Sequence, residues 1–391
     1  MRKVEKSRSS ELNRLAFYIH IPYCVKRCGY CDFNTYTPQE LKTPSLSLIT
    51  SPYIDSAIQE IDLAQREVGS AAIPSIFFGG GTPSLIPGED IARVINHLKR
   101  NFEFTPDIEI TVEVNPDSVT RQFLDEIRAA GANRISMGMQ SAVPHVLNAL
   151  DRTHNPDNVI KSAELIRQTG FPHLSVDLIY GIPGESIADW QRSYELALSL
   201  PIDHLSAYAL IVETGTKLAA RINRGELTLP PEDETAEKYI LLDTAAATNG
   251  FEWYELSNWA KSGGECRHNI GYWDGSYWWG VGPGAHSYYL NRRWWNLKHP
   301  TIYQETIRRG SSPMQNSEEL SVENLNDEFL MLNIRMRSGI GISRLSASQI
   351  DAARRYLATG HIESSSWAED RLVLTPSGRL IADRIVSELL V

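Results

Sequence analysis

Residues 17–33 of the sequence read FYIHIPYCVKRCGYCDF, and they hold three of the chain's four cysteines. Cys24, Cys28 and Cys31 follow a short apolar run in the spacing C-x3-C-x2-C. Thiolates gathered on one short loop are metal ligands far more readily than disulfide partners, because soft sulfur donors suit zinc and iron–sulfur clusters. The stretch therefore predicts a metal centre directly after a strand.

The number of cysteines bears on which metal they hold. Structural zinc takes four ligands, and no fourth ligand lies at the usual short spacing. Three cysteines instead suit a [4Fe–4S] cluster whose fourth iron stays open for a small molecule; a structural zinc or three unrelated thiols is the alternative. C-x3-C-x2-C after a strand resembles the motif of radical S-adenosylmethionine (SAM) proteins. That resemblance implies that the amino and carboxylate groups of SAM chelate the open iron.

The composition favours a cytoplasmic protein. The cysteines form no paired framework, which is typical of a reducing compartment. Residues 1–14 are basic and polar without an apolar core, and no run of about 18 apolar residues occurs, so we expect neither secretion nor a membrane-spanning segment. A net charge of −10 disfavours nucleic acid as a partner.

A pattern of strand followed by helix repeats from residue 15 to residue 213. Six apolar runs suit parallel strands buried on both faces: 15–22, 75–80, 108–116, 133–140, 174–183 and 205–213. Helical stretches lie between them at 53–68, 90–101, 119–130, 155–169 and 188–198, and another follows at 232–248. Such alternation forms right-handed βαβ units. Because a closed barrel requires eight units, residues 1–250 are predicted to form an open (β/α)6 partial TIM-like barrel.

Two further regions follow the predicted barrel. Residues 251–310 are rich in aromatic residues and glycine, and 251–295 hold seven of the nine tryptophans. Aromatic residues at this density either seal the open side of the barrel or offer a platform to a flat apolar ligand. Residues 311–391 are predicted as a small, mainly helical, winged-helix-like domain. It would comprise a polar linker at 311–319, helices at 322–336, 346–357 and 377–390, and a strand at 371–375.

Polar residues recur where the predicted strands end, and a barrel builds its site from these positions. The second strand ends in Gly79-Gly-Gly-Thr-Pro83, where missing side chains let a ligand approach backbone polar groups closely. Glu113 ends the third strand, and its carboxylate can accept hydrogen bonds from an ammonium or hydroxyl group. Any one such residue is more typical of a cap or salt bridge, but together they predict one ligand site.

These positions resemble those of the oxygen-independent coproporphyrinogen oxidase and related families, and the resemblance extends from residue 17 through the helical C-terminus. It implies that matching residues contact SAM, with Tyr30 and Ala209 acting through backbone atoms. The implied SAM contacts are Tyr18, Tyr30, Gly80, Gly81, Thr82, Glu113, Gln140, Arg152, Asp177 and Ala209.

Two features separate the oxidase from a related family. The motif of the oxidase family is similar but longer, C-x3-C-x2-C-x-C, and that family also has a longer N-terminal extension. Here Phe33 stands at the position that corresponds to the fourth cysteine of that motif. His268-Asn-Ile-Gly-Tyr-Trp273 matches the H-N-x-x-Y-W motif of the HemW haem-chaperone family. This resemblance implies haem binding with His268 as an axial ligand, although a histidine among aromatic residues is more often a packing residue. His286 is a second candidate ligand, and Cys266 is expected to be an inert packing residue.

We therefore expect a haem chaperone that binds haem, delivers it to acceptor haemoproteins and carries a [4Fe–4S] cluster and SAM. The alternative is an oxygen-independent coproporphyrinogen III oxidase, in which a 5′-deoxyadenosyl radical starts the oxidative decarboxylation of a porphyrinogen propionate. A radical SAM enzyme with an unrelated substrate is a third interpretation. The sequence leaves open whether SAM is cleaved, and the family suggests a homodimer.

Overall fold

The computed structural model describes residues 13–152 and 154–390, and its main feature is a twelve-stranded sheet among them. The central strands β1 to β6 are parallel and adjacent in chain order. They span Ala16–Ile21, Ala72–Gly80, Glu103–Val114, Arg134–Gln140, His173–Tyr180 and His204–Ala209. Each predicted strand is present, so the partial (β/α)6 barrel is confirmed.

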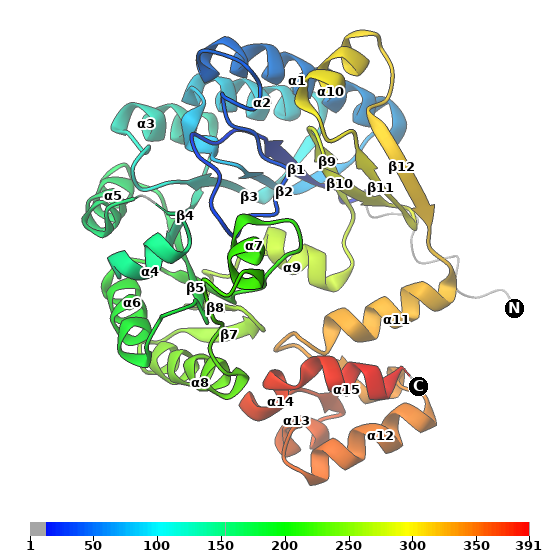
Figure 1. Cartoon of the computed structure of the whole chain (residues 1–391). Helices are drawn as coiled ribbons and strands as arrows, with labels where there is room; N and C mark the ends of the chain where they lie inside the picture. Colours follow the sequence, from blue (N-terminus) through cyan, green and yellow to red (C-terminus); the bar gives the residue numbers. More distant parts are fainter. Residues whose placement is uncertain (1–12, 153, 391) are drawn as a thin grey trace, which may run out of the picture.

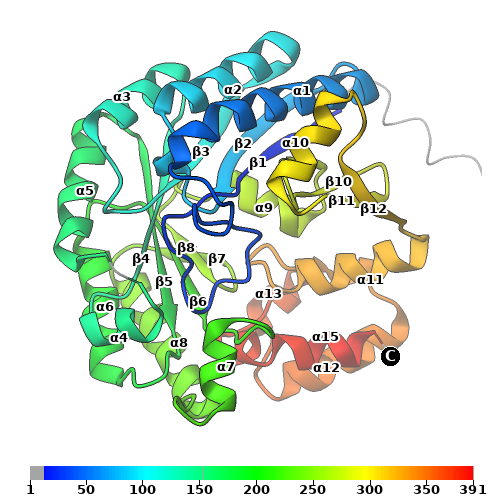
Figure 2. The ribbon, with the colours of Figure 1, turned by 45° about the horizontal axis from the view of Figure 1, so that its top comes forward.

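Helices cover the outside of this curved sheet (Figures 1 and 2). Each buries one apolar stripe, as α2 does with Ile91, Val94, Ile95 and Leu98 at helical spacing. The main outer helices are α1 (Thr50–Val68), α2 (Gly88–Asn101), α3 (Arg121–Ala130), α5 (Pro156–Gln168), α6 (Ile187–Ser199) and α8 (Glu232–Thr248). Shorter helical segments are η1 (Leu46–Leu48), η2 (Pro83–Leu85), α4 (Pro144–Ala149) and α7 (Lys217–Asn223).

The aromatic-rich segment extends the sheet at both edges. On the β6 side, β8 (Asn258–Ala260) and β7 (Glu252–Glu255) add antiparallel strands. On the other side, β9 (Trp278–Val281) pairs parallel with β1, and β10 (His286–Tyr289) and β11 (Arg292–Asn296) continue antiparallel. Between these two additions in the chain, α9 (Arg267–Asp274) contacts β2. After β11, α10 (Pro300–Arg308) packs on α1.

The predicted linker at residues 311–319 is wrong for most of its length. Met314–Glu319 forms β12, the last strand on its side of the sheet, and pairs antiparallel with β11. The sequence there is polar because the strand is largely exposed. Its charges face cations on β11, and Glu318 lies 3.2 Å from Arg293.

The C-terminal helices surround a second apolar core that includes Leu330, Ala353, Leu372 and Ile385. Arg379 fastens this region to the barrel, because its buried guanidinium pairs with Asp243 of α8. The helical segments are α11 (Val322–Asn333), η3 (Ile342–Arg344), α12 (Ala347–Ala358), α13 (Ser364–Ala368), α14 (Pro376–Leu380) and α15 (Ala382–Leu389). Between them, β13 (Ile340–Gly341) pairs antiparallel with β14 (Arg371–Leu372).

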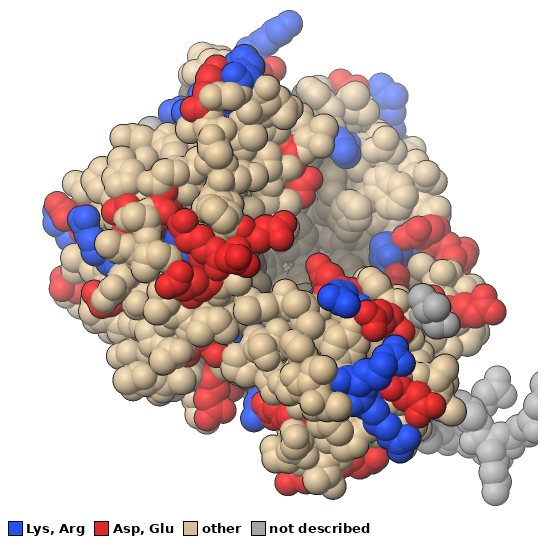
Figure 3. All heavy atoms as spheres, turned by 60° about the horizontal axis from the view of Figure 1, so that its bottom comes forward, with Lys and Arg blue, Asp and Glu red and all other residues tan. Residues whose placement is uncertain are grey.

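The main core lies between the sheet and its outer helices. It contains fully buried Phe17, Ile19, Phe78, Val112 and Leu205 from the barrel strands, which explains why the strand sequences are continuously apolar. The surface carries charges of both signs, and Figure 3 shows acidic side chains gathered beside a recess on one face. Within the described residues, no helix combines the length and hydrophobicity that crossing a membrane requires.

Candidate functional site

A cavity of about 840 Å³ opens inside the barrel and is lined by the carboxyl ends of β1 to β6 and the loops that follow them. Its size is within the range of pockets that hold small-molecule ligands. The structure brings together in this one cavity the three predicted cluster ligands, all the predicted SAM contacts and the first candidate haem ligand. They are Tyr18, Cys24, Cys28, Tyr30, Cys31, Gly80, Gly81, Thr82, Glu113, Gln140, Arg152, Asp177, Ala209 and His268.

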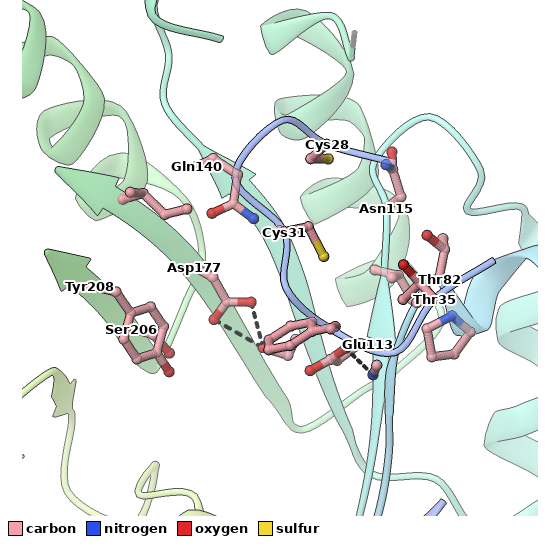
Figure 4. Close-up of a pocket in the computed structure, with 18 of the residues that line it drawn as sticks. Cys28, Cys31, Thr35, Thr82, Glu113, Asn115, Gln140, Asp177, Ser206 and Tyr208 are labelled. Atoms are coloured by element: carbon pink, nitrogen blue, oxygen red, sulfur yellow. Dashed lines mark hydrogen bonds between the residues drawn. The ribbon is translucent and has the colours of Figure 1, made fainter. Parts of the chain in front are cut away.

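The cysteine loop is held in place by backbone hydrogen bonds. The amide of Cys24 donates to the carbonyl of Tyr36 at 3.1 Å, and the amide of Gly29 donates to that of Leu150 at 3.0 Å. At Gly29 a side chain would collide with the carboxylate of Asp151, since an added Cβ would lie 2.7 Å from its Oδ2. The loop therefore presents its thiols over the pocket in a fixed arrangement (Figure 4).

The three thiols lie on one loop and line one cavity. Among residues 13–152 and 154–390, no three His, Cys, Asp or Glu side chains are placed to hold one metal ion. A cubane cluster does not need three ligands around one ion, because each thiolate binds a different iron atom. Burial raises the pKa of Cys31 to about 11, so a cation has to supply the field that ionises it.

A positive charge lies beside the cysteine loop. Nη1 of Arg152 is 3.6 Å from Sγ of Cys28, and Nη2 donates to the carbonyl of Gly138 at 3.0 Å. On the other side, the hydroxyl of Thr82 lies 3.7 Å from Sγ of Cys24. The guanidinium therefore faces one thiol of the loop.

The glycine turn after β2 has to pass very close to β1. The amide of Gly81 donates to the carbonyl of Ile21 at 2.7 Å. Gly80 has a φ of +105°, and a Cβ there would lie 2.4 Å from the ring of His20. At Gly80 both the backbone conformation and the lack of space exclude any residue except glycine. The backbone is therefore open toward the pocket.

Two carboxylates project into the cavity from neighbouring parts of the sheet (Figure 4). Glu113 accepts a hydrogen bond from the amide of Gly80 at 3.3 Å, and Asp177 accepts one from the hydroxyl of Ser136 at 3.0 Å. Burial, and secondly the charge of Asp177, raises the pKa of Glu113 to about 8. Burial also raises the pKa of Asp177 to about 6. Among the described residues, neither carboxylate has a cationic partner close enough to offset the rise in pKa that desolvation causes. Carboxylates in such a state are typical of ligand-binding sites.

Gln140 is presented by a break in β4. Pairing with β5 shifts register between Gly138 and Gln140, and Gln140 has a φ of +63°. A positive φ is uncommon for a residue with a side chain and is retained mainly where the surrounding structure enforces it, often at functional sites.

One wall of the cavity was not predicted from the sequence. Ser206 and Tyr208 line it from β6, Asn258 from β8 and Tyr272 from α9. In Figure 4, Ser206 and Tyr208 lie across the pocket from the cysteine loop. Alternation along β6 could have indicated which side chains face inward, but Asn258 and Tyr272 reach the site only through the long-range placement of β8 and α9.

Helix α9 closes the floor of the cavity, and a buried ion pair holds its beginning. Glu109 accepts hydrogen bonds from the backbone amides of Arg267 at 3.0 Å and His268 at 2.9 Å. Arg134 donates to the carboxylate of Glu109 at 3.1 Å and to the carbonyls of Gly264 and Glu265. A carboxylate at a helix N-terminus satisfies amides that the helix itself cannot.

His268 is buried in this floor with both ring nitrogens occupied. Nδ1 lies 2.9 Å from the hydroxyl of Ser75 and Nε2 lies 3.0 Å from that of Tyr272, while the ring stacks on Phe77. Burial lowers the pKa of His268 to about 4, so the ring is neutral. Iron ligation by His268 would require one of these hydrogen bonds to open, and its role as a haem ligand stays a prediction.

The second candidate haem ligand, His286, and the expected packing residue Cys266 lie in different places, and of these two only Cys266 lines the cavity. His286 is exposed on β10, stacks on Trp295 and does not line the cavity. Cys266 is buried at the start of α9, where its thiol lies 3.4 Å from the carboxylate of Glu109.

The fold and the site define the class of protein. Residues 18–197 match the model of the Radical SAM superfamily, a class that implies a [4Fe–4S] cluster and SAM. The chain is also 45% identical to "Heme chaperone HemW" of Mycobacterium tuberculosis, over 95% of this chain and 94% of that protein. The HemW of Bacillus subtilis is 33% identical over 84% of this chain and 85% of its own length. The chain therefore belongs to the HemW family.

The solved structures include a close match in fold. Coproporphyrinogen III oxidase (HemN) of Escherichia coli superimposes with a TM-score of 0.80, over 98% of this chain and 91% of that chain. The two sequences are only 20% identical, so the likeness supports the shared architecture alone.

Proposed function

We propose that the protein is a haem chaperone that binds haem and transfers it to acceptor haemoproteins, with a [4Fe–4S] cluster and SAM held in the barrel. The observation that carries the proposal is the 45% identity to HemW over 95% of the chain. Phe33 supports it, because this exposed side chain stands where the resembling oxidase has a further cysteine.

Cys24, Cys28 and Cys31 would hold the cluster, and the donor set suits it. All three thiols line one cavity from one loop. The guanidinium of Arg152 lies 3.6 Å from Sγ of Cys28. When bound, cluster and SAM would supply one-electron reductive chemistry.

The opposite side of the cavity suits the polar parts of SAM. The open backbone at Gly80 and Gly81 and the carboxylate of Glu113 would receive its amino-acid end, since a carboxylate accepts hydrogen bonds from an amino group. Asp177, oriented by Ser136, offers acceptor oxygens to hydroxyl groups such as those of a ribose. The protein's part is to bind and orient SAM against the cysteine loop.

The test uses anaerobically reconstituted protein in two assays. In the first, haem-loaded protein is mixed with an apo-haemoprotein, and recovery of the acceptor's absorbance spectrum measures transfer. In the second, protein, SAM and reductant are incubated with coproporphyrinogen III, with the Escherichia coli oxidase as the positive control. We expect transfer in the first and no protoporphyrinogen IX in the second.

The second assay discriminates between the two functions because decarboxylation demands a positioned propionate. Misplacing reacting atoms by about 1 Å can cost on the order of a hundredfold in rate, so a shared barrel does not ensure the reaction. Multiple-turnover formation of protoporphyrinogen IX would overturn the chaperone proposal in favour of the oxidase.

A further inference from the structure

The mouth of the barrel cavity carries unusually exposed apolar side chains. Val25 is 64% exposed and Phe33 is 60% exposed, and both belong to the cysteine loop. Across the cavity, Tyr208 is 45% exposed and Ile211 is 70% exposed, beyond the buried part of β6. All four line the same cavity. Single exposed apolar residues are ordinary, but a group of them around one opening marks a surface that binds something apolar.

The interior of the cavity carries several polar groups among its apolar lining. Its walls present Glu113, Ser136, Asp177, Ser206 and Asn258, which are hydrogen-bonding groups. These suit a polar ligand such as SAM, whereas an apolar macrocycle buried among them would leave the remaining acceptor sites of the carboxylates unpaired. An apolar ligand is therefore better accommodated at the mouth than in the depth.

Charge at the mouth is arranged unevenly. Lys26 and Arg27 lie on the cysteine loop between Cys24 and Cys28, but Arg27 is engaged by Glu40 at 3.1 Å. Lys26 is exposed, and within the described residues it forms no ion pair. The exposed acids that line the cavity are Asp32, Asp117 and Glu213. An anionic group would thus be drawn to the side of Val25 and Lys26.

We propose that haem binds at the mouth of the cavity, with its macrocycle between Val25 and Phe33 on one side and Ile211 on the other, and a propionate directed to Lys26. Haem fits this surface because it is a flat apolar ring with carboxylates along one edge. The inference rests on the proposed haem-chaperone function and specifies where haem lies. It places haem above the SAM pocket and away from His268, which lies on the buried floor.

Haem titration followed by visible absorbance tests the site on the full-length, cluster-loaded protein. The variants are Val25→Asp, Ile211→Asp and Lys26→Glu, because each places a negative charge on the proposed binding surface. We expect each aspartate variant to bind haem about tenfold or more weakly, as is common when a central apolar contact is lost. Lys26→Arg should retain the affinity that Lys26→Glu loses.

Matched controls lie elsewhere on the surface. Val322→Asp changes an apolar side chain that is 74% exposed on α11, outside the cavity lining, and should bind haem like the wild type. Lys161→Glu makes the same charge change on an exposed position of α5. Iron content and SAM affinity are measured on every variant, so that a misfolded loop is recognised separately from a lost haem contact.

The possible outcomes test the position of the haem site and the haem-chaperone function separately. Weaker haem binding by Val25→Asp and Ile211→Asp, with iron content and SAM affinity retained, supports the site. Wild-type affinity in both would overturn it, and a loss confined to His268→Ala would place haem at the floor instead. Absence of haem binding by the wild type would overturn the chaperone function itself.

Discussion

The guanidinium of Arg134 lies 3.1 Å from the carboxylate of Glu109 at the floor of the barrel, and both side chains are only 2% exposed. Burial by itself would raise the pKa of Glu109, but the charge of Arg134 and the amides of His268 and Arg267 outweigh it, so the pKa lies below its ordinary value. The pair joins β3 and β4 to the start of α9, which carries the H-N-x-x-Y-W motif.

Arg134→Met should destabilise the protein by about 3–5 kcal/mol, because removing one partner leaves a buried charge uncompensated. Urea unfolding of the cluster-free protein measures the change. Arg121→Met is the control, since its ion pair with Asp125 is more than half exposed on both sides and should contribute less than about 1 kcal/mol. Equal effects from the two variants would contradict the structural role given to the buried pair.

Replacing Cys24, Cys28 and Cys31 together with alanine should abolish iron and sulfide loading, because these thiols are the proposed cluster ligands. Cys266→Ala is the matched control and should load normally, since Cys266 lies at the start of α9 beside Glu109. Chemical analysis of iron and sulfide after anaerobic reconstitution measures both. Retained loading in the triple variant, or zinc as the native metal, would refute the assignment.

The parallel half of the fold could be predicted from sequence because strands buried on both faces are continuously apolar. The short strands added at the two edges of the sheet could not be predicted. Strands β7 to β11 have three to five residues each, too few for alternation to be recognised, and their aromatic residues suit several structures. Met314–Glu319 is polar, so only pairing with β11 reveals it as a strand.

The candidate site also has one part that could be predicted from the sequence and one part that could not. Residues at strand ends could be gathered from sequence because parallel strands bring their carboxyl ends to one edge. The floor could not be predicted, since Glu109 and Arg134 contact the start of α9 and the residues before it across 130 residues of chain or more. Without that contact, His268 could be judged only by its motif, and its hydrogen bonds to Ser75 and Tyr272 were not foreseen.

Glu113→Gln should weaken SAM binding about tenfold or more, the size expected when a charge-assisted hydrogen bond is lost. Calorimetry on cluster-loaded protein measures the affinity. The control is Glu103→Gln at the exposed opposite end of β3, which should leave affinity unchanged. If both variants bound SAM like the wild type, Glu113 would be removed from the proposed site.

Gly80→Ala should both destabilise the protein and weaken SAM binding. Its Cβ would lie 2.4 Å from the ring of His20, at a φ of +105°. Gly170→Ala separates the effect of a positive φ from the effect of a steric clash, because Gly170 has a φ of +85° but open space around it. That control should show only the backbone cost of about 1–3 kcal/mol, with SAM affinity intact. Similar losses of SAM affinity in both variants would argue against a close-packed glycine turn.

The last prediction concerns pH and Glu60, a buried carboxylate that joins α1 to the aromatic-rich extension. It accepts hydrogen bonds from the amide of Gly282 at 2.8 Å and from Asn296 at 2.6 Å, and also from the hydroxyl of Tyr303. Burial outweighs these donors and raises the pKa of Glu60 from 4.5 to about 7.

Between pH 4.5 and 7 the folded protein therefore holds a proton at Glu60 that the unfolded chain has released. Stability contributed by this group is greatest at low pH and falls as pH rises toward 7, after which it is constant. Glu60→Gln cannot titrate, so subtracting its free energy of unfolding from that of the wild type isolates the effect from other carboxylates. Urea unfolding at pH 5, 6, 7 and 8 should give a difference that declines across the first three values and then levels. A difference that stayed flat, or that grew with pH, would show that Glu60 is ionised in the folded protein throughout the range.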